Sequence, residues 1–368
     1  IMKMTFRWYG SRNDKITLAQ IRQITGVQGI VGALYDIPVG EVWPVAEIMA
    51  LKQEIEAAGL EFKTVESVNV HEDIKLGLPS RDRYIANYIA TLKNLGQAGV
   101  NVVCYNFMPV FDWTRTDLAK PLPDGSTALS FDHRVIDGKD PAELAQAIAV
   151  HSNGFVLPGW EPERLQELQR LFKLYEGMDE EKLFANLEYF LKAVVPAAEK
   201  LGIRLAIHPD DPPMSVFGLP RIVTNLKNLD RIVGLVDSPS NALAICTGSL
   251  GSNLKNDIPA IVRHFGERDR LGFMHVRNIK VHEPWVFNEV AHSSKEGSLD
   301  LYAVMKALYD THYQGPLRPD HGRMIWGEQG MPGYGLYDRA LGANYLLGLW
   351  DAICRDHETG KAGAGTCS

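Results

Sequence analysis

Residues 203–213, IRLAIHPDDPP, form a short apolar run that ends in a histidine and then turns into a proline-rich loop. Three later stretches repeat this pattern: ALAICTGS (242–249), RLGFMHVRN (270–278) and QGPLRPDHGR (314–323). In all four, a β-prone run leads to a residue of metal-ligand type: His208, Cys246, His275 and Asp320. The carboxyl ends of the eight strands of a (β/α)8 barrel converge on one face, so these four side chains would meet there.

The rest of the chain carries the alternation that such a barrel needs. Strand-like runs are expected at 5–9, 29–34, 60–67, 100–107, 203–208, 242–246, 271–275 and 316–320. Helical patterns with apolar residues three and four apart are expected at 18–24, 44–59, 83–99, 183–202, 219–236, 257–266, 299–312 and 336–353. Strands that alternate with helices imply a parallel sheet, and eight of them can close it. We therefore predict an α/β fold, a (β/α)8 TIM barrel, as one domain over residues 1–368.

One segment interrupts this rhythm after the fourth strand. Residues 108–178 are rich in Pro, Gly, Asp and aromatic residues, and an insertion at this place would lie on the same face as the metal-type residues. It could act as a lid or provide subunit contacts, and both interpretations stay open. A homo-oligomer, most simply a dimer, is expected. The Gly- and Ala-rich end, 359–368, is expected to be a flexible tail.

Composition narrows the class of protein. The chain has 368 residues and a formal net charge of −7, with acidic and basic residues interspersed, which argues against nucleic acid as a partner. No apolar run approaches the length of a membrane span. The four cysteines suggest no disulfide framework, so a cytoplasmic protein is expected.

The four strand-end residues suit a divalent transition metal, since they offer two imidazoles, a thiolate and a carboxylate. Asp210 or Asp211 could orient a histidine ligand as a hydrogen-bond acceptor. A closed, purely structural zinc site is the main alternative, because four protein ligands suffice for one.

Two nearby residues are candidates for proton transfer. His321 directly follows Asp320 and can accept or donate a proton near neutral pH, and Asp320 itself counts among the catalytic candidates. Tyr334 lies between two glycines in PGYG (332–335), which permits close approach to a ligand.

Further candidates could hold a substrate. Arginine binds carboxylates in a bidentate way, which favours Arg7 at the end of the first strand and Arg115 in the insertion. Trp8, beside Arg7 at the end of the first strand, is a further candidate, and His71 and His292, placed after the third and seventh strands, are weaker ones. Each of these side chains taken alone is more often structural.

These strings together resemble the mannonate dehydratase family, within the xylose-isomerase-like group of barrels. The resemblance runs over nearly the whole chain, through FRWYG (6–10), ALYDIPVGEVW (33–43), ESVNVHEDIK (66–75), CYNFMPVFDWTRTDL (104–118), HPDDPP (208–213), DSPSNALAICTGSLG (237–251), HVRN (275–278), RPDHGR (318–323) and PGYGLYDRALG (332–342).

The resemblance implies dehydration of D-mannonate to 2-keto-3-deoxy-D-gluconate in hexuronate breakdown. It implies Mn(II) or Fe(II) held by the residues at positions 208, 246, 275 and 320, with proton transfer by His321 and Tyr334. It does not settle which of the two is the base. The alternatives are a metal-dependent sugar isomerase on the same barrel and a non-enzymatic protein with structural zinc.

Overall fold

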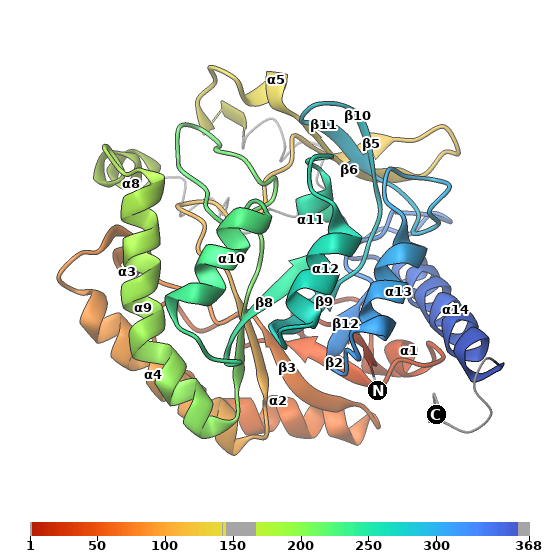
Figure 1. Ribbon diagram of the computed structural model, residues 1–368, viewed down its shortest axis with the longest axis horizontal. Coiled ribbons are helices and arrows are strands. Elements are labelled where there is room, and N and C mark those ends of the chain that lie inside the picture. Colours follow the sequence, from red (N-terminus) through yellow and green to blue (C-terminus); the bar gives the residue numbers. More distant parts are fainter. Residues whose placement is uncertain (1, 142, 145–166, 360–368) are drawn as a thin grey trace.

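Eight parallel strands close a barrel in the computed structural model, which describes residues 2–141, 143–144 and 167–359 (Figure 1). Around the barrel the order is β1, β12, β9, β8, β7, β4, β3, β2. The bounds are β1 Lys3–Arg7, β2 Gly29–Gly32, β3 Glu61–Glu66, β4 Val102–Tyr105, β7 Arg204–Ile207, β8 Asn241–Cys246, β9 Leu271–His275 and β12 Pro316–Arg318. All eight predicted strands are confirmed, and the (β/α)8 barrel with them.

Helices surround the barrel (Figure 1). The longer ones are α2 Val45–Ala57, α4 Arg81–Gln97, α9 Glu180–Leu201, α10 Leu226–Leu235, α12 Ile258–Gly266, α13 Leu301–Asp310 and α14 Tyr337–Thr359. The shorter ones are α1 Leu18–Arg22, α3 Glu72–Leu76, α5 His133–Ile136, α8 Leu168–Leu174 and α11 Thr247–Gly251. Among the described residues, none of the helices combines the length and apolar character that a membrane crossing requires.

The helix expected within 219–236 is α10, which begins only at Leu226. Asn225 caps it, since its side chain accepts a hydrogen bond from the Asn228 N–H at 2.9 Å. An asparagine that binds the first-turn backbone favours an extended conformation at its own position and so fixes the boundary.

The two faces of each strand enter different apolar clusters. Outward positions such as Leu243 and Ile245 of β8 join the large core between sheet and helices. Inward positions form a second, small cluster inside the barrel: Val31, Val102, Cys104, Ala206, Ala244 and Phe273. Most of its members are small, so the fully buried ring of Phe273 is its bulkiest member.

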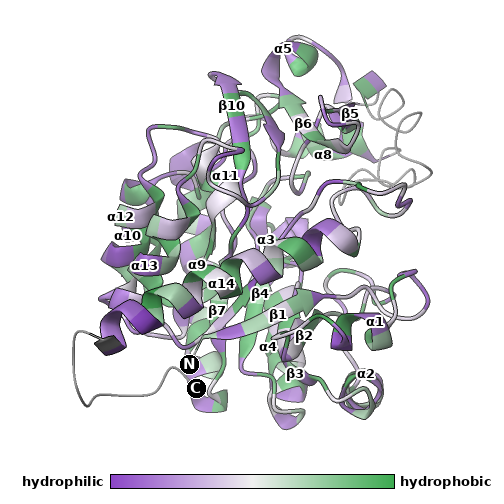
Figure 2. Cartoon of the chain, turned by 90° about the vertical axis from the view of Figure 1, so that its right-hand side faces the viewer, coloured by the Kyte–Doolittle hydropathy of each residue, from purple (hydrophilic) through white to green (hydrophobic). Residues whose placement is uncertain are grey.

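A second sheet, which the sequence did not predict, lies over one end of the barrel. It has the order β10 (Ile279–Glu283), β11 (Val286–Glu289), β6 (Thr127–Asp132), β5 (Asp117–Pro121), and Figures 1 and 2 both place it at the same end. β5 and β6 belong to the segment expected as an insertion, whereas β10 and β11 form a hairpin after β9. The two excursions therefore stabilise each other by antiparallel pairing of β11 with β6.

Two predicted segments lie partly or wholly outside the described residues. The segment 108–178 contains positions 142 and 145–166, and the expected tail contains 360–368. Position 359 is the last residue of α14.

The interior cluster yields a test of what holds the barrel. Phe273→Ala should lower the free energy of unfolding by about 3–5 kcal/mol, because the small neighbours cannot collapse into the space of the lost ring. Urea denaturation followed by circular dichroism measures this. Leu254→Ala is the matched control, since that leucine is 63% exposed and its truncation should change little. Equal effects in the two variants would contradict a packed barrel interior.

Candidate metal centre and active-site cavity

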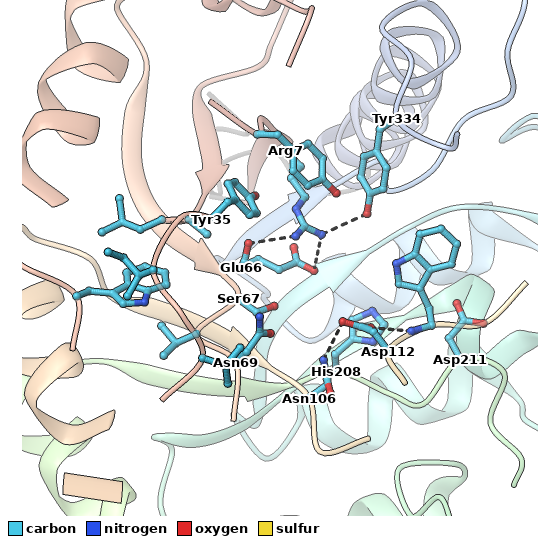
Figure 3. Close-up of a pocket in the computed structure, with 18 of the residues that line it drawn as sticks. Arg7, Tyr35, Glu66, Ser67, Asn69, Asn106, Asp112, His208, Asp211 and Tyr334 are labelled. Atoms are coloured by element: carbon cyan, nitrogen blue, oxygen red, sulfur yellow. Dashed lines mark hydrogen bonds and ion pairs between the residues drawn. The ribbon is translucent and has the colours of Figure 1, made fainter. Parts of the chain in front are cut away.

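A cavity of about 460 Å³ opens at the carboxyl ends of the barrel strands (Figure 3). Its polar wall comes from strand ends and includes Arg7, Glu66, His208, Arg318 and Asp320. Its other wall is apolar and aromatic, with Leu34, Ile37, Trp43, Tyr84 and Tyr88. Asp112 and Trp113 of the insertion also line it. The cavity therefore has one charged wall and one apolar wall.

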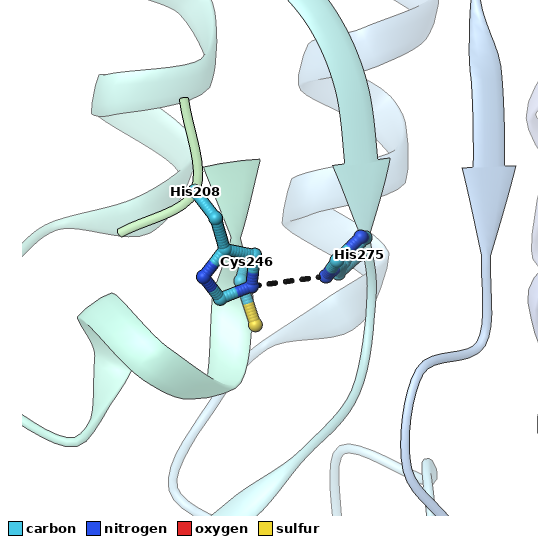
Figure 4. A group of neighbouring side chains, drawn as sticks. All are labelled: His208, Cys246 and His275. Atoms are coloured by element: carbon cyan, nitrogen blue, oxygen red, sulfur yellow. Dashed lines mark hydrogen bonds between the residues drawn. The ribbon is translucent and has the colours of Figure 1, made fainter. Parts of the chain in front are cut away.

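Three of the four metal-type residues meet in one group. His208, Cys246 and His275 each present a ligand atom, and these atoms lie within 4.8 Å of one another (Figure 4). His275 is fully buried and Cys246 nearly so. Their strands β7, β8 and β9 are neighbours in the barrel, which explains the convergence of residues distant in sequence.

The hydrogen bonds around the two imidazoles fit a metal ion. Nδ1 of His208 lies 2.6 Å from the carbonyl oxygen of Pro209, so this nitrogen donates and Nε2 is left unprotonated. That Nε2 faces His275 Nδ1 at 3.2 Å. On its far side, His275 Nε2 faces the carboxylate of Glu66 at 3.3 Å. Two ring nitrogens turned toward each other beside a thiol form a donor set that suits a cation between them.

The fourth residue, Asp320, borders this group. Its Oδ2 lies 3.3 Å from Cys246 Sγ, and its Oδ1 lies 3.8 Å from His275 Nδ1. The Asp320 backbone has φ of 59°, a left-handed conformation that is uncommon outside glycine. A strained backbone at a site usually marks a functional demand, and here it lets the carboxylate turn toward the ligands.

Asp210 and Asp211 do not orient His208, contrary to expectation. The carbonyl of Pro209 occupies its Nδ1. Asp210 accepts from the Val223 N–H, and Asp211 binds Arg115 with both oxygens, at 2.7 and 3.0 Å.

A network of buried charges surrounds the ligands. Its members are four arginines and four acids: Arg7, Arg115, Arg277, Arg318, Glu66, Asp211, Glu289 and Asp320. Arg277 contacts three of the acids, at 2.5 Å from Asp320 and 2.9 Å from both Asp211 and Glu289. Buried ions need this degree of pairing, since an isolated one would carry a large desolvation cost.

The pairing keeps the acids ionised. Burial pushes the pKa of Glu66 upward, but Arg318, His275 and Arg7 outweigh it and hold this pKa well below its usual value. Burial also opposes ionisation of Glu289, yet His321 and Arg277 lower the pKa of that carboxyl. The acids therefore act as hydrogen-bond acceptors for the side chains they touch.

His321 and Tyr334 both line the cavity, as candidates for proton transfer should. Their ring centroids lie 5.0 Å apart. His321 Nδ1 lies 2.6 Å from Glu289 Oε1, and the Tyr334 hydroxyl accepts a hydrogen bond from Arg7 at 3.2 Å. Each of the two side chains thus has one polar contact with a charged side chain, Glu289 for His321 and Arg7 for Tyr334.

Two of the substrate-binding candidates lie on the cavity wall. Arg7 does so beside Tyr334 and Glu66. His71 lies farther out, where it caps α3 through Asp73 N–H and stacks on Tyr84 at 3.7 Å. Burial lowers the pKa of His71 and thereby favours its neutral form.

The other three candidates are not on this wall. Trp8 is buried and donates its indole N–H to the Ile16 carbonyl. His292 is buried, and its Nε2 bonds to the carbonyl oxygen of Pro319, the residue before Asp320. Arg115 is fully buried against Asp211 and Glu289, so as placed it positions other residues and does not grip a substrate directly.

Comparison with known proteins identifies the family of this chain. The model of the family described as D-mannonate dehydratase (UxuA) matches residues 2–359. The chain belongs to this family. It is 61% identical over 352 residues to the mannonate dehydratase of Thermotoga petrophila, covering 96% of this chain and 98% of that one. It is 57% identical over 367 residues to the Geobacillus thermodenitrificans enzyme, covering 100% and 99%.

Solved structures agree with the family. The crystal structure of mannonate dehydratase from Streptococcus suis serotype 2 superposes with a TM-score of 0.89 at 48% identity, over 100% of this chain and 99% of that one. An L-ribulose 3-epimerase structure has a TM-score of 0.53 at 12% identity, which extends to the fold alone.

Sequence reasoning missed the charged residues that support the site. Glu66, Arg277, Arg318 and Glu289 were not singled out, although Glu66 and Arg318 end barrel strands. One available signal was a charged residue at the carboxyl end of an apolar strand. Arg318 had a second signal, because it stands two residues before Asp320 and so on the same side of the chain. Nothing in the sequence indicated that β11 would bring Glu289 to His321.

The metal group predicts a difference between two buried cysteines. Cys246→Ala should lose most bound metal, because the thiol of Cys246 belongs to the group with His208. Cys104→Ala should keep it, although Cys104 lies near His275 and Glu66, because burial raises the pKa of its thiol and keeps it a poor ligand. Elemental analysis of both purified variants measures this. Wild-type metal content in Cys246→Ala would remove that residue from the centre.

Arg115 gives a second test, which measures the stability of the fold and not the binding of substrate. Arg115→Ala should destabilise the fold by about 3–5 kcal/mol, since it leaves Asp211 and Glu289 buried with one cation fewer. Thermal and urea unfolding measure this loss. The control is Arg134→Ala, whose arginine pairs with Asp132 at the surface and should matter little. Wild-type stability with a raised KM would instead return Arg115 to the substrate.

Proposed function

We propose that this protein is a hydro-lyase that removes water from D-mannonate and yields 2-keto-3-deoxy-D-gluconate. The observation that carries the proposal is one cavity lined by His321, Tyr334 and His208, the last of which belongs to the group with Cys246 and His275. Membership of the D-mannonate dehydratase family supports the substrate. A role in hexuronate breakdown follows from the same substrate.

The proposed metal is Mn(II) or Fe(II), held by His208, Cys246, His275 and Asp320. Imidazole and carboxylate ligands suit both ions, and a thiolate draws the preference toward iron. When bound, such an ion would supply Lewis-acid stabilisation for the charge that develops on the substrate carboxylate and 2-hydroxyl.

We propose His321 as the base, and its hydrogen bonding supports this role. Glu289 is an ionised acceptor at Nδ1, so the ring proton of a neutral His321 resides on Nδ1. The lone pair of Nε2 is then free to take the proton from C2 of mannonate. The electron pair of the C2–H bond forms the C2–C3 double bond of an enol.

We propose Tyr334 as the acid. Its oxygen accepts a hydrogen bond from Arg7 and its hydroxyl shares one with Tyr9, so on substrate binding its proton would turn from Tyr9 to the substrate. That proton joins the leaving 3-hydroxyl as the C3–O bond breaks, and water departs. The enol then takes a proton at C3 while its 2-hydroxyl loses one, and it becomes the 2-keto product.

Arg7 is also the proposed grip for the substrate carboxylate, since its guanidinium lies on the cavity wall. His71 is the proposed contact at the outer end of the cavity. The segment 108–178 is proposed as a cover for the cavity, with support from the cavity contacts of Asp112, Trp113 and Leu118. The homodimer and the cytoplasmic location stay predictions.

The alternatives have less support. A purely structural zinc site would be closed, whereas His208 and Asp320 border an open cavity. A sugar isomerase of this barrel type would use a carboxylate-dominated site, and the Cys246 thiol with two imidazoles argues against one.

The role assignment predicts two different defects. His321→Asn and Tyr334→Phe should each lower kcat by about 10²-fold or more, the usual contribution of a positioned proton-transfer group. Metal content should stay at the wild-type level in both, because neither residue is a proposed ligand. Turnover is measured by formation of the 2-keto product from mannonate.

Solvent deuterium exchange at C2 separates the roles. Tyr334→Phe should still exchange, since it retains the base, whereas His321→Asn should not. The opposite pattern would reverse the assignment of acid and base. Wild-type turnover in both variants would show that neither residue transfers the proton.

A further inference from the structure

The ring of His275 presents its two nitrogens to different neighbours. Nδ1 lies 3.2 Å from His208 Nε2, in the metal group, and Nε2 lies 3.3 Å from Oε2 of Glu66. The ring is fully buried, and within the described part of the chain Nε2 has no hydrogen-bond partner. A buried ring N–H without a partner is costly, so this nitrogen needs an acceptor.

Glu66 is held in place to serve as that acceptor. Arg318 donates to both of its carboxylate oxygens at 3.0 Å, and Arg7 lies 3.6 Å away. These contacts fix the Glu66 carboxylate beside His275 Nε2. The ligand atoms of Glu66, Cys104 and His275 lie within 4.8 Å of one another.

Neighbouring side chains restrict the ring of His275 on the sides that do not face Glu66. Phe273 packs its ring at 90° to that of His275, with centroids 4.6 Å apart. Arg318 Nη2 lies 3.5 Å from Nδ1 on the other side. Neighbours on several sides leave the Glu66 carboxylate as the acceptor that Nε2–H can reach.

We propose that Glu66 is the positioning residue of the metal centre. It accepts a hydrogen bond from His275 Nε2–H and so holds the tautomer in which Nδ1 is free to bind the ion. The inference rests on the metal centre proposed above. Partners of this kind fix the orientation of a ligand imidazole and raise its basicity, and their loss typically weakens metal binding 10- to 100-fold.

The test measures metal binding without any substrate. The full chain is stripped of metal and titrated with Co(II), whose absorption spectrum reports on the ligands. Glu66→Gln keeps the length of the side chain but loses its charge and one acceptor oxygen. Its dissociation constant for Co(II) should rise about 10- to 100-fold, with a shifted spectrum. Wild-type affinity and spectrum would overturn the proposal.

Two controls separate orientation from other causes. Glu289→Gln removes the same charge from the same network but beside His321, so its Co(II) affinity should stay near wild type. An equal loss in both variants would assign the effect to network charge and overturn the proposal. Glu66→Asp keeps the charge near Arg318 and draws the carboxylate back by one methylene. It should bind Co(II) weakly while remaining folded, and wild-type affinity in it would also overturn the proposal.

The same titration tests the metal centre itself. Cys246→Ala should bind Co(II) much more weakly than wild type. If Cys246→Ala binds normally, the proposed centre is wrong, and the inference about Glu66 falls with it. If Cys246→Ala binds weakly and Glu66→Gln binds normally, only the inference about Glu66 is wrong.

Discussion

Charge pairing away from water is the constraint on which the rest of this structure depends. Three guanidiniums and four carboxylates lie buried at the carboxyl end of the barrel beside the half-buried Arg7, and each buried charge would be costly there alone. Their contacts join distant parts of the chain: Arg318 of β12 reaches Glu66 of β3, and Arg115 reaches both Asp211 and Glu289. The network therefore fastens the segment after β4 to the hairpin after β9 and holds the barrel end rigid.

This rigidity has a chemical use, because two of the acids each face an imidazole. Glu66, clamped by Arg318 and Arg7, lies beside His275, and Glu289, paired with Arg115 and Arg277, lies beside His321. An acid that is fixed by arginines stays ionised and stays in place. One glutamate thus supports the metal group and the other the proton-transfer group, so orientation is set before a substrate arrives.

The barrel separates stability from chemistry along each strand. Outward side chains pack against helices, and the lower inward ones form the small cluster around Phe273. The candidate ligands and acid–base groups lie at or after the carboxyl ends of the strands, as does His275, two residues beyond Phe273 on β9. The family's chemistry can therefore be supported by a core that takes no part in it.

The sequence by itself determined the barrel and its eight strands, and it supplied the candidates for metal ligands and proton transfer. Strand periodicity, glycine helix ends and ligand-type residues after apolar runs are local signals, and local signals can be read from one chain. Only the tertiary structure decided which side chains face each other. It paired Glu289 with His321 through a small sheet built from two separate excursions, and it buried Arg115 behind Asp211 of the cavity wall. Contacts of this kind depend on three-dimensional register between separate segments, and no spacing along the chain encodes them.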